Sequence, residues 1–75
     1  MKTKQYYLGS FTYKGIHIYV YANMDGCGHS DWYVIGDRWY LGYGELVDGL
    51  EAVGVEIDPD ELSRVRREVY RKVLP

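Results

Sequence analysis

The aromatic residues are concentrated in the first part of this chain, and this distribution constrains its fold more than any other feature. Eleven of the twelve tyrosine, tryptophan and phenylalanine residues precede residue 44, and only Tyr70 follows. Aromatic and β-branched residues favour strands. The sequence therefore predicts an α+β fold (ββββαα), in which a four-stranded antiparallel sheet made of two hairpins precedes two helices packed on one of its faces. With 75 residues, the chain is expected to form a single small domain over residues 1–75.

The first hairpin is predicted over residues 6–13 and 16–22, with Lys14 and Gly15 as a two-residue turn. Residues that face each other across two antiparallel strands lie on the same face of the sheet. One face is then apolar and is expected to join the core: Phe11, Tyr13, Ile16, Ile18 and Val20. The opposite face, which we call the tyrosine face, is expected to carry Tyr6, Leu8, Ser10, Thr12, His17, Tyr19 and Tyr21.

The second hairpin is predicted over residues 32–35 and 38–43, with a two-residue turn at Gly36 and Asp37. With this turn, four apolar side chains of the hairpin share one face of the sheet, and we expect them in the core: Trp32, Val34, Trp39 and Leu41. The other set is expected to extend the tyrosine face: Tyr33, Ile35, Arg38 and Tyr40. A longer turn would change this assignment, because a shift of one residue turns every side chain of a strand to the other face.

Two helices are predicted after the strands. The first begins near Gly44 or Glu45 and ends at Gly54, with an apolar face made by Leu46, Leu50 and Val53. Gly49 weakens this helix by about 1 kcal/mol relative to alanine. The second helix begins with an N-cap, a proline and an N3 glutamate at Asp58, Pro59 and Glu61. Its apolar stripe is Leu62, Val65, Val69 and Val73.

The tyrosine face is the predicted contact surface for a protein partner. Tyrosine offers a large contact area with few torsions to fix, and aromatic and arginine side chains dominate binding hot spots. The candidate partner-binding residues are Tyr6, His17, Tyr19, Tyr21, Tyr33, Arg38 and Tyr40. The same pattern also fits a homodimer face or an ordinary solvent-facing sheet. Stacking of single-stranded nucleic acid is disfavoured, since basic residues are few around these aromatics.

The net charge of −2 conceals three segments of different sign. Residues 1–14 carry +3, residues 15–63 carry −9 and residues 64–75 carry +4. Seven acids make a candidate acidic surface: Glu45, Asp48, Glu51, Glu56, Asp58, Asp60 and Glu61. Such a surface can bind a basic protein and imitate phosphates, in the manner of small phage anti-defence (anti-CRISPR-like) inhibitors. An ordinary solvated helix face is the alternative.

Two further groups of residues give weaker evidence for a functional site. Metal-ligating and nucleophilic residue types gather in one glycine-rich segment, at Asp25, Cys27, His29 and Asp31, but their spacing matches no metal motif. We therefore predict no metal site, no cofactor and no catalytic residue. Arg64, Arg67 and Arg71 on the second helix suggest nucleic-acid binding, yet the acidic start of that helix argues against it.

The overall prediction is a small, non-enzymatic protein-binding module, acting as an inhibitor through the tyrosine face and the acidic surface. No apolar run approaches the roughly 18 residues of a membrane span. The single cysteine, Cys27, permits no internal disulfide, which agrees with a cytoplasmic location.

Overall fold

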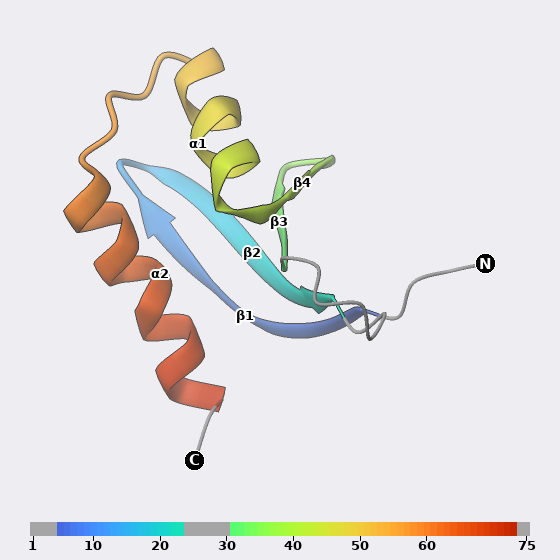
Figure 1. Ribbon diagram of the computed structural model, residues 1–75. Coiled ribbons are helices and arrows are strands. Elements are labelled where there is room, and N and C mark those ends of the chain that lie inside the picture. Colours follow the sequence, from blue (N-terminus) through green and yellow to red (C-terminus); the bar gives the residue numbers. More distant parts are fainter. Residues whose placement is uncertain (1–4, 24–30, 74–75) are drawn as a thin grey trace.

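The computed structural model describes residues 5–23 and 31–73, and it confirms the predicted ββββαα arrangement (Figure 1). The strands form one antiparallel sheet in the order β1-β2-β3-β4, with bounds β1 Gln5–Tyr13, β2 Ile16–Asn23, β3 Trp32–Ile35 and β4 Arg38–Leu41. Helix α1 spans Gly42–Ala52 and α2 spans Pro59–Val73. Figure 1 shows α2 running beside β1, and α1 continuing directly from the end of β4.

The first hairpin has the predicted turn and the predicted register. Lys14 and Gly15 both have positive φ, at 48° and 82°, as a type I′ turn requires. Tyr13 pairs with Ile16 and Phe11 with Ile18. The turn is also held from outside, because the Lys14 ammonium donates a hydrogen bond of 2.7 Å to the carbonyl of Glu56.

A β-bulge in β1 changes the face of its first residues. The register shifts between Tyr7 and Gly9, so that Tyr7 pairs with Tyr21 and Tyr6 pairs with Ala22. Tyr7 therefore lies on the tyrosine face, and the prediction that Tyr6 and Leu8 lie there is wrong. Leu8 instead packs against the core.

The second hairpin has the predicted two-residue turn. Trp32 pairs with Leu41, Tyr33 with Tyr40 and Val34 with Trp39, so the predicted grouping of side chains is confirmed. The assignment of these groups to the two faces of the sheet is reversed. Tyr33 lies opposite Val20 of β2, which is fully buried.

This pairing places Tyr33, Ile35 and Tyr40 on the helix-covered face. Tyr33 is only 2% exposed, and both Ile35 and Tyr40 pack against the core. Trp32, Val34 and Trp39 lie on the face that no helix of the described chain covers. The expected positions of Tyr33, Arg38 and Tyr40 on the tyrosine face are therefore wrong.

The core lies between the sheet and the two helices. Both helices and three of the strands contribute buried side chains to it: Phe11, Tyr13, Ile18, Val20, Tyr33, Leu46, Leu50, Leu62 and Val69. Val65 packs against this core as predicted, whereas Val53 is 63% exposed and does not. The side chain of Val73 lies outside the described part of the chain.

The helix ends explain the path between α1 and α2. Helix α1 begins at Gly42, earlier than predicted, and ends in a Schellman motif in which Gly54 has φ 88° and the Val55 amide donates to the Leu50 carbonyl. The Asp58 carboxylate caps α2 by accepting hydrogen bonds from the amides of Asp60 and Glu61. The Asp58 amide donates to the Tyr13 hydroxyl at 2.8 Å, instead of to Glu61.

Candidate functional site

The sheet face opposite the helices carries an aromatic surface. We call this surface the open aromatic face, and it is made by Tyr7, His17, Tyr19, Tyr21, Trp32 and Trp39. The strand register fixes it, because directly paired residues share a face. Tyr21 of β2 pairs with Tyr7 of β1 on one side and with Trp32 of β3 on the other.

The rings of the open aromatic face form a connected series across all four strands. His17 contacts Tyr19 at 4.7 Å between ring centroids, and Tyr7 contacts Tyr19 and Tyr21 at 6.3 and 5.3 Å. Tyr21 contacts Trp39 at 5.0 Å, and Trp39 contacts Trp32 at 6.0 Å. The interplanar angles lie between 38° and 77°, so the rings are tilted or edge to face and do not form a flat platform.

Three of these side chains remain strongly exposed. Tyr7 is 55% exposed, Trp39 is 45% exposed and Tyr19 is 39% exposed. His17 is also exposed, and its Nδ1 lies 3.3 Å from the hydroxyl of Thr12 on the same face. Contiguous exposed apolar surface of this kind commonly marks an interaction site.

The same sheet face carries no formal charge. Twelve positions belong to it by strand pairing: Gln5, Tyr7, Ser10, Thr12, His17, Tyr19, Tyr21, Asn23, Trp32, Val34, Trp39 and Leu41. None of them is aspartate, glutamate, lysine or arginine, although such residues make up 27% of the chain. Solvated faces of antiparallel sheets are usually polar. This face therefore differs from an ordinary solvent-facing sheet.

Only some of the predicted contact residues lie on the open aromatic face. His17, Tyr19 and Tyr21 lie there as predicted. Tyr6 is 51% exposed, but its partner Ala22 places it on the opposite side of the sheet. Three residues that sequence reasoning did not assign to this surface belong to it: Tyr7, Trp32 and Trp39.

Tyr33 belongs instead to a polar chain between β3 and α2. The Arg66 guanidinium donates to the Tyr33 hydroxyl at 3.0 Å, and the Tyr70 hydroxyl donates to the Asp31 carboxylate at 2.7 Å. The two phenol oxygens lie 3.0 Å apart. Because the Tyr70 proton is donated to Asp31, the Tyr33 hydroxyl is the donor between the two tyrosines. Because each hydroxyl has partners, Tyr33 can be buried and Tyr70 half-buried at this position.

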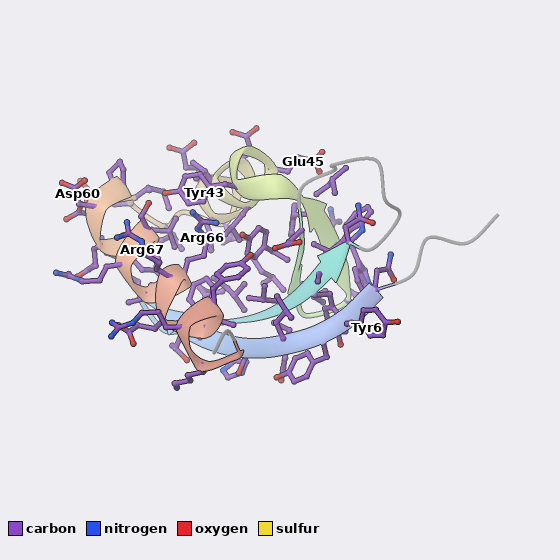
Figure 2. All side chains as sticks on the ribbon, turned by 60° about the horizontal axis from the view of Figure 1, so that its bottom comes forward. Tyr6, Tyr43, Glu45, Asp60, Arg66 and Arg67 are labelled. Carbon is purple, nitrogen blue, oxygen red and sulfur yellow. The ribbon has the colours of Figure 1, made fainter. Side chains whose placement is uncertain are left out.

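The surroundings of this polar chain change two pKa values. Burial, then the hydrogen bonds to Tyr33 and Asp31, raise the pKa of Tyr70 well above its ordinary value, so this phenol stays protonated. Burial alone would lower the pKa of Arg66, but its hydrogen bonds and proximity to Tyr33 and Tyr70 raise it overall. The Arg66 guanidinium also lies 4.8 Å from the ring centroid of Tyr43, its neighbour in Figure 2.

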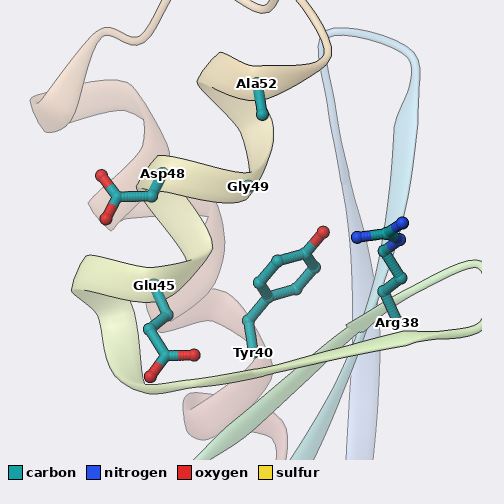
Figure 3. A pocket seen from close by; sticks show the side chains of 6 residues that line it. All are labelled: Arg38, Tyr40, Glu45, Asp48, Gly49 and Ala52. Carbon is teal, nitrogen blue, oxygen red and sulfur yellow. The ribbon is translucent and has the colours of Figure 1, made fainter.

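Tyr40 and Arg38 line a shallow pocket of about 310 Å³ on the helix side of the sheet (Figure 3). The ring of Tyr40 lies against α1 at Gly49, and Arg38 flanks it on β4. Glu45 and Asp48, one turn apart on α1, form another part of the rim. The Glu45 carboxylate also accepts a hydrogen bond from the Leu41 amide at the start of α1.

The candidate acidic surface lies on the helix side of the molecule. Six of its residues are exposed and Glu61 is half-buried; the exposed ones are Glu45, Asp48, Glu51, Glu56, Asp58 and Asp60. Figure 2 shows Glu45 and Asp60 on the same side of the sheet as the helices. Within residues 5–23 and 31–73, none of these acids forms an ion pair. The acidic surface is therefore separate from the open aromatic face.

Most of the glycine-rich segment with metal-ligating residue types, Asp25, Cys27 and His29, lies outside the described residues. Asp31 is described, and its carboxylate accepts hydrogen bonds from the Asn23 amide and from Tyr70. Among the residues that the structure describes, no three His, Cys, Asp or Glu side chains are grouped to hold a metal ion.

The three arginines of α2 that suggested nucleic-acid binding are exposed. Arg64, Arg67 and Arg71 all face solvent, and Arg71 forms an ion pair of 3.1 Å with Glu68. Neither helix in the described ranges combines the length and apolar character that a membrane span requires.

Comparisons with known proteins found no relationship. No protein-family model, no curated protein and no solved structure matches this chain.

Proposed function

We propose that this chain is a small, non-enzymatic protein-binding module that contacts its partner through the open aromatic face. The observation that carries this proposal is the connected series of rings across four strands, with Tyr7, Tyr19 and Trp39 strongly exposed. Tyrosine and tryptophan are the side chains most enriched at binding hot spots. Buried in an interface, each such side chain removes a large apolar area from water.

The chemistry of the face favours a protein over a nucleic acid. Single-stranded nucleic acids bind to aromatic residues set in a positively charged groove. The twelve positions of this face include no lysine and no arginine, so they cannot neutralise phosphates. The rings are also tilted against each other, whereas bases stack on accessible ring faces. Tilted, projecting rings suit insertion between the side chains of a protein partner.

Adjacent tyrosines provide a matched test of this proposal. Tyr7 and Tyr6 have nearly equal exposure, 55% and 51%, but lie on opposite faces of the sheet. The chain is used as bait in an affinity capture, in four forms: wild type, Tyr7→Ala, Trp39→Ala and Tyr6→Ala. A thermal melt of each form checks that it is folded.

We expect wild type and Tyr6→Ala to capture the partner. Tyr7→Ala and Trp39→Ala are expected to lose it. Truncation of one hot-spot residue to alanine costs about 2 kcal/mol or more of binding free energy, which corresponds to an affinity about thirtyfold weaker. A partner that all four forms retain equally would show that binding uses another surface, and this would overturn the proposal.

The acidic surface is a second candidate, for a basic partner. The observation that favours it is the pocket beside Tyr40, whose lining includes Glu45 and Asp48. The two carboxylates and the Tyr40 ring suit an inserted lysine or arginine side chain, through charge and cation–π attraction, against the like charge of Arg38 on the same pocket. Such binding fits an inhibitor that imitates phosphates. This second proposal predicts that the affinity for a basic partner falls as salt is added. The double variant Glu45→Gln plus Asp48→Asn should also lower that affinity, and much more than Glu51→Gln, which lies outside the pocket.

A further inference from the structure

We propose that the partner of the open aromatic face is a second copy of this chain, in a twofold-symmetric dimer whose sheets pack face to face. This inference rests on the proposed function, since it names the partner of the same surface. Sheets that pack face to face lie about 10 Å apart, with their inner side chains interdigitated. The dimer would have four layers, helices, sheet, sheet and helices.

The charge distribution is the first reason to choose a second copy. In a twofold interface the same surface patch of each copy faces the other. A patch that carries mainly one sign of charge would therefore face that same sign in the second copy. Like charges across an interface are costly. Each copy carries a net charge of −2, but the twelve positions of this face carry no charged side chain. A partner of opposite charge would instead be recognised by charges on the face.

The position of the charged groups supports the same choice. Glu45 and Asp60 of the candidate acidic surface, and Arg66 and Arg67 of α2, lie on the helix side of the sheet (Figure 2). Face-to-face packing therefore brings together the least charged surfaces of the two copies. It leaves the acidic surfaces of both copies exposed to solvent.

The exposed area sets the expected strength of the dimer. An aromatic side chain has about 200 Å² to bury, so Tyr7, Tyr19 and Trp39 together leave roughly 300 Å² exposed per copy. The typical specific interface buries about 800 Å² per partner, so these three side chains supply less than half of that area, and the other uncharged positions of the face must contribute the rest. We expect a reversible dimer with a dissociation constant on the order of micromolar. Self-association would also bury apolar area that such a small domain lacks in its own core.

Sedimentation equilibrium over a dilution series tests this proposal. The samples are wild type, Tyr7→Ala and Tyr6→Ala, at concentrations from about 1 µM to about 500 µM, which bracket the expected dissociation constant. The wild-type mass is expected to rise with concentration from 8.8 kDa towards twice that value. Each side chain is used twice in a twofold dimer, so Tyr7→Ala is expected to raise the dissociation constant at least about tenfold. Tyr6→Ala is expected to behave as wild type.

Trp39→Ala provides the same test on β4 if Tyr7→Ala fails to fold. A wild-type mass that stays at 8.8 kDa throughout would overturn the second copy as partner. A dimer that Tyr7→Ala and Trp39→Ala leave intact, or that Tyr6→Ala weakens equally, would overturn the proposed interface. A monomer that still captures another protein through Tyr7 and Trp39 refutes this inference alone. If those two changes affect neither self-association nor capture, the proposed function also fails.

Discussion

The exchange of Gly49 for alanine should destabilise the protein, against the expectation from helix propensity. Gly49 lies inside α1, where alanine is favoured by about 1 kcal/mol. The sequence alone therefore predicts a gain in stability. The structure predicts a loss, because a Cβ at residue 49 would lie 2.6 Å from both Cε1 and Cζ of Tyr40 and 3.1 Å from its Cδ1.

The size of this loss follows from the overlap. Carbon atoms in contact prefer separations of about 3.5 to 4.0 Å, so the Tyr40 ring would have to move by about 1 Å or leave its site. Overpacking of this kind costs about 1–3 kcal/mol. After the gain in propensity, we expect Gly49→Ala to lower the free energy of unfolding by about 1 kcal/mol.

Gly44 is the matched control within the same helix. It is exposed in α1, and a Cβ there would meet no atom within 4 Å. Gly44→Ala should therefore stabilise the protein by up to about 1 kcal/mol. In a Tyr40→Ala background, Gly49→Ala should become stabilising as well, and the double-mutant cycle then measures the coupling of the two residues.

Urea denaturation at equilibrium measures all of these variants, with the slope of each transition checked for two-state behaviour. This experiment also tests the reversal of the second hairpin. If Tyr40 lay on the open face, Gly49→Ala would stabilise as Gly44→Ala does, and the cycle would show no coupling. That result would refute the placement of Tyr40 against α1.

Three further predictions concern the polar contacts that hold the fold together. Since the pKa of Tyr70 is raised in the folded chain, the stability linked to its proton is present below about pH 10 and falls above it, by up to about 1.4 kcal/mol per pH unit. Tyr70→Phe should remove this part of the alkaline slope in denaturation curves, and an unchanged slope would contradict it. Asp58→Ala should lower the free energy of unfolding by about 1 kcal/mol through loss of the α2 cap, and no loss would show that the cap is dispensable. Tyr13→Phe should cost about 1 kcal/mol as well, because the Asp58 amide loses its partner, and thermal melts that coincide with wild type would refute it.

The order of elements and the first hairpin could be predicted because their signals are local. The Lys14-Gly15 turn fixes the register of β1 and β2 up to the bulge, and Asp58 and Pro59 mark the start of α2. Leu46 and Leu50 also follow the predicted helical spacing. Each of these signals depends on residues close together in the sequence.

The two faces of the second hairpin depend on distant contacts. The turn at Gly36 groups the side chains correctly, but only the pairing of Val20 with Tyr33 decides which group meets the helices. From the sequence alone, we expected the tryptophan group in the core. The structure buries Tyr33 instead, because Arg66 and Tyr70 of α2 satisfy its hydroxyl.

The bulge at Leu8 could not be predicted from alternation alone. A strict period of two places Tyr6 on the same face of the sheet as Tyr19. The register shift places Tyr7 on that face instead. Gly9 beside it was a local signal, since glycine within a strand often marks a bulge. The tyrosine face was therefore found in part, through His17, Tyr19 and Tyr21, and its most exposed members were missed.

The most direct test of the open aromatic face uses the two tryptophans of the chain, both of which lie on it. The indole N–H signals of Trp32 and Trp39 are followed by NMR as the chain is concentrated, or as a captured partner is added. We predict that the Trp39 signal shifts progressively with binding, while the backbone amides of Leu62 and Val69 in α2 stay in place. Shifts confined to the helices, with both indole signals unchanged, would contradict the claim that this face binds a protein.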